Sequence, residues 1–117
     1  MADGGRLTVH VLDLARGQPA AGLGIALFRL GEQGREALGL WRTNADGRCD
    51  GPLLEGTAYT AGQYELVFEV GEWREALAGE TGLYDEIPIR LRVHDEAAHL
   101  HVPLLLAPYG YSTYRGS

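Results

Sequence analysis

The sequence predicts an all-β fold in which two sheets pack as a sandwich, and two observations support this prediction. Short runs in which apolar and polar residues alternate recur along the chain, as is typical of half-buried strands. Most of the 17 glycines lie between these runs rather than inside them, as expected for turns. The 117 residues fit a single domain, 1–117, of a size at which association adds useful burial. We therefore expect an oligomer.

The first predicted strand covers residues 7–13. Leu7, Val9 and Val11 share one face of it, because side chains alternate along a strand. His10 then lies on the opposite face, away from the core. This position makes His10 a candidate functional residue.

A loop is predicted at residues 13–24, where Gly and Pro recur. Two strands follow, at about residues 25–30 and 36–43, and the run 31–34 between them predicts a turn. The next turn is the sequence Asn-Ala-Asp-Gly at 44–47, since Asn, Asp and Gly tolerate a positive φ. This turn places Arg48 at a fixed loop edge.

Residues 64–70 alternate again and predict a strand that ends at Gly71. One short helix is expected after it, ended by Gly79. The apolar residues that recur there at helical spacing are Trp73, Ala76 and Leu77.

Two strands with a turn at residues 95–98 complete the predicted sheets. In the first of them, Ile87, Ile89, Leu91 and Val93 form one face, and Arg90, Arg92 and His94 form the other. In the second, which we expect to be the last strand, Leu100, Val102 and Leu104 face one way, and His99, His101 and Pro103 face the other. His101 therefore resembles His10 in lying on a face away from the core.

The C-terminal run 101–117 is apolar and aromatic almost to its last residue, with three tyrosines among the final nine residues. Termini are usually poorly ordered unless something holds them. We therefore expect this terminus to be packed against other residues.

Composition excludes several classes of function. The formal net charge is −6 and no basic run is present, so nucleic acid is not an expected partner. No apolar stretch approaches the roughly 20 residues that span a bilayer, so no membrane is expected either. Cys49 is the single cysteine and no signal-like segment precedes the first strand, so we expect a cytoplasmic protein.

His10, Arg48, His101 and the tail form the candidate site. Two imidazoles that titrate near neutral pH can act as base and acid. A guanidinium offers paired donors to a carbonyl or a developing anion. The set suits hydrolysis of a polar, planar, amide-like ring.

Three other interpretations remain open from the residues. His99 and His101 share a strand face and, with His10, have the composition of a three-histidine metal site. Cys49 follows Arg48, which could activate the thiol, although a small packed thiol is the better interpretation. Ser117 has no evident base beside it, so a role in substrate binding fits it better than nucleophilic attack.

Several motifs give the chain a clear resemblance to the 5-hydroxyisourate hydrolase family of transthyretin-related proteins. They are Leu7-Thr8-Val9-His10-Val11-Leu12-Asp13, Gly17-Gln18-Pro19-Ala20, Thr43-Asn44-Ala45-Asp46-Gly47-Arg48, Ile87-Pro88-Ile89, His101-Val102-Pro103-Leu104-Leu105-Leu106 and Tyr114-Arg115-Gly116-Ser117. The terminal tetrapeptide is the most specific. Leu100, Ala107 and Tyr109 stand where the family often has Tyr, Ser and Phe, and none of them is a catalytic position.

The resemblance implies a transthyretin-like β-sandwich of two four-stranded sheets with one short helix. It also implies a homotetramer with active sites at the dimer–dimer interface of a central channel. The catalytic residues would be His10, Arg48 and His101. The terminal residues Tyr114, Arg115, Gly116 and Ser117 would complete the substrate-binding pocket.

The reaction that the resemblance implies is the ring opening of 5-hydroxyisourate by water, without a metal or an organic cofactor. Its product is 2-oxo-4-hydroxy-4-carboxy-5-ureidoimidazoline, formed in urate breakdown. The alternative is a carrier, since transthyretin binds thyroid hormones in the same channel without catalysis. A hormone channel is expected to be apolar, whereas His10, Arg48 and His101 are polar.

Overall fold

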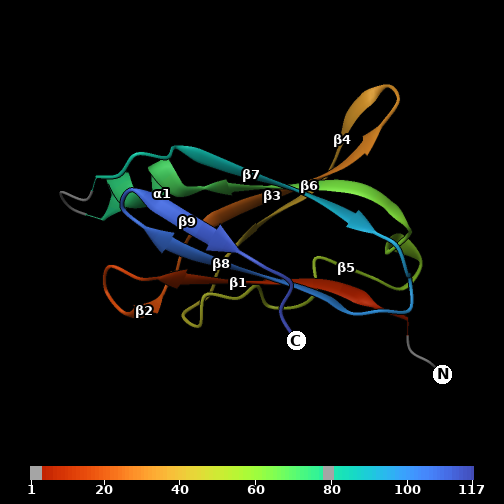
Figure 1. Cartoon of the computed structure of the whole chain (residues 1–117), viewed down its shortest axis with the longest axis horizontal. Coiled ribbons are helices and arrows are strands. Elements are labelled where there is room, and N and C mark those ends of the chain that lie inside the picture. The colour runs from red at the N-terminus through yellow and green to blue at the C-terminus, as the bar shows by residue number, and fades with distance from the viewer. Residues whose placement is uncertain (1–3, 78–80) are drawn as a thin grey trace.

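The computed structural model describes residues 4–77 and 81–117, which form two sheets packed face to face (Figure 1). One sheet has four antiparallel strands in the order β4–β3–β6–β7. These strands are β3 (Gly24–Gly31), β4 (Gly34–Arg42), β6 (Gly62–Glu69) and β7 (Glu86–Val93). They agree with the predicted strands to within a few residues at each end.

The second sheet has the order β2–β1–β8–β9, and β5 pairs with the start of β1. Its strands are β1 (Arg6–Asp13), β2 (Gln18–Pro19), β5 (Leu54–Glu55), β8 (Leu100–Ala107) and β9 (Gly110–Thr113). The β-sandwich prediction is confirmed. This sheet has one strand more than the four predicted, because the two-residue β5 is added to it. The predicted loop 13–24 contains the equally short strand β2.

The hydrophobic core lies between the two sheets. Leu7, Val9 and Val11 of β1 are buried there, as the alternation predicts. They pack with the buried apolar residues of β8 and of the other sheet, including Val102, Leu104, Ile25, Leu27, Leu66 and Phe68. The face of β1 that carries His10 is turned away from this core.

Strand β6 differs from its prediction in two ways. Its central residues, from Tyr64 to Phe68, are buried on both faces rather than alternating. On the face away from the core, the Glu65 carboxylate is covered by ion pairs with Arg35 and Arg90. Val70 is the first residue of the helix and not the last residue of the strand. Its side chain is fully buried, so the apolar pattern continues across the boundary between strand and helix.

The predicted short helix is α1 (Val70–Ala76). Trp73 anchors it to the body of the protein, because its indole Nε1 donates a hydrogen bond to the carbonyl oxygen of Ala21 at 2.9 Å. Gly79, the predicted end of the helical pattern, lies outside the described residues. A single 3₁₀ turn, η1 (Gly56–Ala58), leads into β6, and neither helix has the length or hydropathy to span a membrane within the described segments.

The C-terminal segment differs most from expectation. The strand β8 is not the last one, because the chain turns back and adds β9 antiparallel to it. The tail backbone is fixed by a bridge between His101 and Gly116. The tyrosine side chains remain largely exposed in this chain, since Tyr109, Tyr111 and Tyr114 are 72%, 39% and 56% exposed, although Tyr111 meets the ring of Tyr84 edge to face at 5.1 Å.

Candidate active site

Two neighbouring strands build the centre of the site. Strands β1 and β8 run parallel, and their register places Thr8 opposite His101 and His10 opposite Pro103. The rings of His10 and His101 therefore lie close together, with 6.3 Å between their centroids. Both rings are on the face turned away from the core.

The turn at residues 44–47 is fixed by the side chain of Asn44. Its Oδ1 accepts hydrogen bonds from the backbone N–H of Asp46 at 2.9 Å and of Arg48 at 3.1 Å, which is an Asx-type turn. Gly47 is required because it has φ 74° and a Cβ there would lie 2.3 Å from the carbonyl oxygen of Val11. The predicted turn is confirmed.

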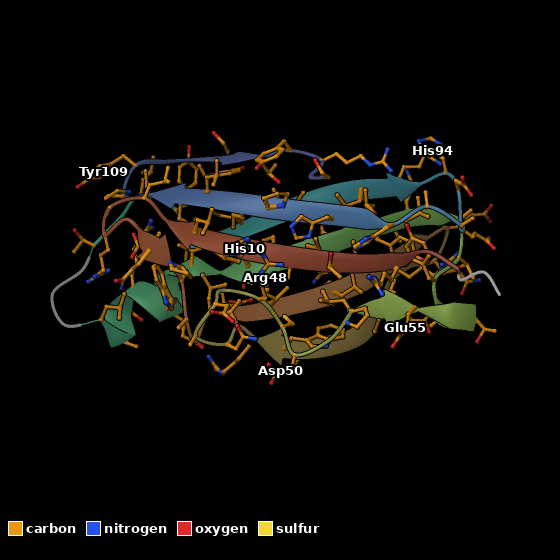
Figure 2. All side chains as sticks on the ribbon, turned by 90° about the horizontal axis from the view of Figure 1, so that it is seen from below. His10, Arg48, Asp50, Glu55, His94 and Tyr109 are labelled. Carbon is orange, nitrogen blue, oxygen red and sulfur yellow. The ribbon has the colours of Figure 1, made fainter. Side chains whose placement is uncertain are left out.

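This turn is joined to β1, so that Arg48 is held next to the histidines. The backbone N–H of Val11 donates to the carbonyl of Gly47 at 2.8 Å. His10 Nε2 lies 3.0 Å from the carbonyl oxygen of Asp46, and since a carbonyl only accepts, the imidazole donates this bond. Figure 2 shows His10 and Arg48 near the middle of the molecule, while Tyr109 and His94 lie toward its two ends.

A cavity of about 400 Å³ opens beside these residues. Its polar lining comes from Arg6, Thr8, Arg48, His99, His101 and Ser117. Arg6 and Arg48 give this lining positive charge, and no Asp or Glu is among the described residues that line it. His10 is not part of this lining, but its ring lies 6.3 Å from the ring of His101.

His101 is a half-buried titratable group of this cavity. Burial lowers the pKa of its imidazole below the ordinary 6.5, and the nearby charges of Arg48, His10 and His99 lower it further. A lowered pKa favours the uncharged form of His101 at neutral pH. An uncharged imidazole can accept a proton from water, while Arg48 can stabilise negative charge on a carbonyl oxygen.

The terminal residues are divided between two places. Gly116 donates its backbone N–H to the carbonyl of His101 at 2.8 Å, and Ser117 reaches the cavity. The Arg115 guanidinium instead lies 3.4 Å from the carbonyl oxygen of His99 and lines a different cavity with Tyr59 and Arg92. Tyr114 is exposed. Of the four predicted binding residues, this chain alone therefore brings Gly116 and Ser117 to the site.

Cys49 packs against the hydrophobic core, as predicted for a small packed thiol. Burial raises the pKa of this thiol to about 11, and the charge of Asp50 adds to the increase. The thiolate that a nucleophile needs is therefore scarce at neutral pH. Cys49 also lines the cavity, which its sequence position did not indicate.

The three-histidine metal site is not formed. His99 and His101 have their ring centroids 6.4 Å apart, and the ring nitrogens that they turn toward each other are both occupied by hydrogen bonds to the hydroxyl of Thr8. Within residues 4–77 and 81–117, no group of three or more His, Cys, Asp or Glu is placed to hold a metal ion.

Sequence reasoning missed Thr8 and Arg6 as residues of the site. The signal was present, because Thr8 and Arg6 precede His10 by two and four residues and share its strand face. Thr8 is the more informative of the two, since its hydroxyl touches both His99 and His101.

Comparisons with known proteins agree with this structure. The model of the HIUase/Transthyretin family matches residues 7–116. The 5-hydroxyisourate hydrolase of Mesorhizobium japonicum is 56% identical over 99% of this chain and 95% of its own length. The structure of Klebsiella pneumoniae 5-hydroxyisourate hydrolase is 37% identical, with a TM-score of 0.81 over 97% of this chain and 94% of that one.

A longer protein contains the same fold. The crystal structure of (S)-allantoin synthase is 41% identical to this chain, with a TM-score of 0.91 over 98% of it. This chain spans 44% of that protein. The family model covers residues 7–116, and the Mesorhizobium relative matches over nearly its full length. The chain therefore belongs to the HIUase/Transthyretin family.

Proposed function

We propose that this protein hydrolyses 5-hydroxyisourate to 2-oxo-4-hydroxy-4-carboxy-5-ureidoimidazoline. The observation that carries the proposal is the cavity lined by both His101 and Arg48, with the His10 ring 6.3 Å from that of His101. Relatives that align with nearly the whole chain bear the name of this activity. The substrate is a small molecule, and a cavity of about 400 Å³ is of the size that holds one.

The reaction needs three events at one ring. Water loses a proton as its oxygen attacks a ring carbonyl, the carbon–nitrogen bond breaks, and the leaving nitrogen takes up a proton. We assign the proton transfers to His10 and His101. General acid–base catalysis of this kind contributes about two to four orders of magnitude in rate. Arg48 positions the substrate and stabilises the negative charge on the attacked carbonyl oxygen.

A carrier role is less compatible with the lining. A pocket for an apolar hormone gains its affinity from apolar and aromatic walls. Here Arg6, Arg48 and His101 contribute charged and polar groups instead. Charged groups left unpaired by an apolar ligand would weaken its binding, because their desolvation would not be compensated.

The homotetramer is part of this proposal, and exposed apolar side chains support it. Tyr109, Tyr111 and Tyr114 are exposed on the C-terminal segment, and Leu14 is 55% exposed. Such side chains are typical of association surfaces. Ser117 already lines the cavity, so burial of Tyr114 between subunits would place the subunit interface beside the site. Light scattering coupled to size-exclusion chromatography tests the tetramer.

A single functional domain and a cytoplasmic location complete the proposal. The two sheets share one hydrophobic core, which supports treating the chain as one unit. Cys49 is a free thiol, which suits a reducing compartment.

The direct experiment follows the ultraviolet absorbance of freshly generated 5-hydroxyisourate with and without the protein. We expect the protein to accelerate the decay well above the spontaneous rate, and a chelator to leave the acceleration intact. A decay that the protein does not change would reject the hydrolase. Loss of activity on chelation would instead indicate a metal-dependent mechanism.

A further inference from the structure

The hydroxyl of Thr8 connects two histidines. Thr8 Oγ1 lies 2.8 Å from His101 Nδ1 and 3.0 Å from His99 Nε2. Both distances are those of good hydrogen bonds. Thr8, His99 and His101 therefore form a hydrogen-bonded triad along the wall of the cavity.

The fold holds this hydrogen-bonded triad in place. The parallel register sets Thr8 directly opposite His101. His99 precedes β8 by one residue and His101 by two, so the two rings share a face, as residues two apart on an extended chain do. His101 is half buried and His99 is exposed, so the hydrogen-bonded triad extends from the cavity toward solvent.

The number of protons limits how the three groups can be arranged. A threonine hydroxyl carries one proton and two acceptor lone pairs, and a neutral imidazole carries one N–H. Thr8 can donate to one ring only. At least one of the two histidines must therefore donate its N–H to Thr8.

We propose that Thr8 and His99 are positioning residues that fix the ring orientation and the tautomer of His101. In this arrangement His101 donates its Nδ1–H to Thr8 Oγ1, and Thr8 donates its hydroxyl proton to His99 Nε2. Nε2 of His101 is then left without a hydrogen and can accept the proton of the attacking water. This inference rests on the proposed hydrolase function and assigns the base role to His101.

The arrangement also supports His101 during the reaction. When Nε2 takes the proton, the ring becomes an imidazolium, and its Nδ1–H bond to Thr8 becomes charge-assisted. Such bonds are roughly twice as strong as neutral ones. The half-buried His101 thus gains stabilisation in its charged form, which burial alone opposes.

The test begins with two substitutions of Thr8. Thr8→Val keeps the β-branched shape but removes the hydroxyl, so we expect kcat to fall about tenfold, as one lost hydrogen bond implies. KM is expected to stay within about twofold, because the Thr8 hydroxyl is occupied by the two imidazoles and Val keeps the shape of the side chain in the lining. Thr8→Ser keeps the hydroxyl and is expected to retain most of the wild-type kcat. A Thr8→Val enzyme with wild-type kcat overturns the proposal.

Thr113→Val is the matched control. It also removes one hydroxyl hydrogen bond to β8, from Thr113 Oγ1 to the carbonyl of Pro103 at 2.8 Å, but none to an imidazole. We expect its kcat to match the wild type. An equal loss in both variants would mean that the Thr8 effect is structural, and the proposal would fail.

Nitrogen NMR of the ¹⁵N-histidine-labelled protein reads the tautomer without any substrate. We expect neutral His101 to carry its proton on Nδ1 in the wild type and in Thr8→Ser, and to populate both tautomers in Thr8→Val and in His99→Ala. A wild-type His101 protonated on Nε2, or a tautomer that is the same in every variant, overturns the proposal. Because this measurement needs no turnover, it stands even if the protein does not act on 5-hydroxyisourate.

Discussion

Gly116 lies against the ring of His101 so closely that a Cβ at this glycine would come within 2.6 Å of His101 Cδ2. The same Cβ would meet Pro103 Cγ at 3.2 Å. Gly116 also donates its backbone N–H to the carbonyl of His101. The C-terminal tetrapeptide therefore sets the position of a catalytic candidate even where its side chains are exposed.

Gly116→Ala should therefore displace the His101 ring. We expect kcat/KM for 5-hydroxyisourate to fall about a hundredfold, since small misplacements of a catalytic group have effects of this size. The melting temperature should change little. Gly110→Ala is the control, because a Cβ at Gly110 meets nothing within 4 Å, and a similar loss in both variants would contradict this account.

Arg48→Ala should lower kcat/KM at least about a hundredfold, as expected for removal of a donor that stabilises developing charge. Arg48→Lys should recover little of this loss, because an ammonium lacks the paired donors of a guanidinium. Steady-state kinetics measure both. Arg42→Ala is the control: it removes an exposed arginine whose partners are the carbonyl of Gly22 and Glu72. If Arg48→Ala and Arg42→Ala behave alike, Arg48 has no part in the reaction.

The pKa of His101 should be measurable below 6.5, the ordinary value for histidine, because burial and the neighbouring Arg48, His10 and His99 disfavour its charged form. The active, uncharged ring then persists as the pH falls below 6.5, and activity is lost only when the pH passes through the lowered pKa. Proton NMR titration gives this midpoint. Arg48→Gln should move it upward, since a positive neighbour is removed. A midpoint at or above the ordinary value would contradict the electrostatic argument.

Glu65 provides a test of the fold rather than of the site. Its buried carboxylate binds Arg35 at 2.8 Å and Arg90 at 3.1 Å, and the hydrogen bond from Arg35 is the main reason why the pKa of Glu65 is lowered. A lowered carboxyl pKa means that this stabilisation is present above the unfolded-state pKa and is lost as the pH falls through the lowered value.

Glu65→Gln should reduce the free energy of unfolding at neutral pH by about 1–2 kcal/mol, a value reduced by screening because both arginines are exposed. Urea denaturation measures it, and the difference from wild type should shrink in acid. Glu72→Gln, which breaks an exposed pair with Arg42 at 3.4 Å, should cost less than about 0.5 kcal/mol. Equal costs for the two variants would show that the buried pair has no special role.

Local patterns in the sequence predicted most of the strands and the turn before Arg48. The alternation around His10 correctly placed this ring outside the core, since period-2 spacing decides the face of a strand. The Asn44 turn was predictable because its residue types determine its backbone. The structure brings His10 close to His101 and lines one cavity with Arg48 and His101, while the roles of all three residues stay predictions.

Long-range features could not be predicted in the same way. The contact between Thr8 and His101 depends on the parallel register of β1 and β8, which joins residues far apart in the chain and leaves no local pattern. The strand β9 was missed because its sequence has no apolar alternation and is held by pairing with β8. Val70 was misassigned because a buried helix start and a buried strand end are equally apolar.

The decay of 5-hydroxyisourate with His101→Ala tests the central claim most directly. The wild type and His94→Ala, which changes an exposed histidine outside the site, should both accelerate the loss of absorbance. His101→Ala should be slower by at least about a hundredfold, the size expected for a lost acid–base group. Decay as fast with His101→Ala as with the wild type would contradict the account.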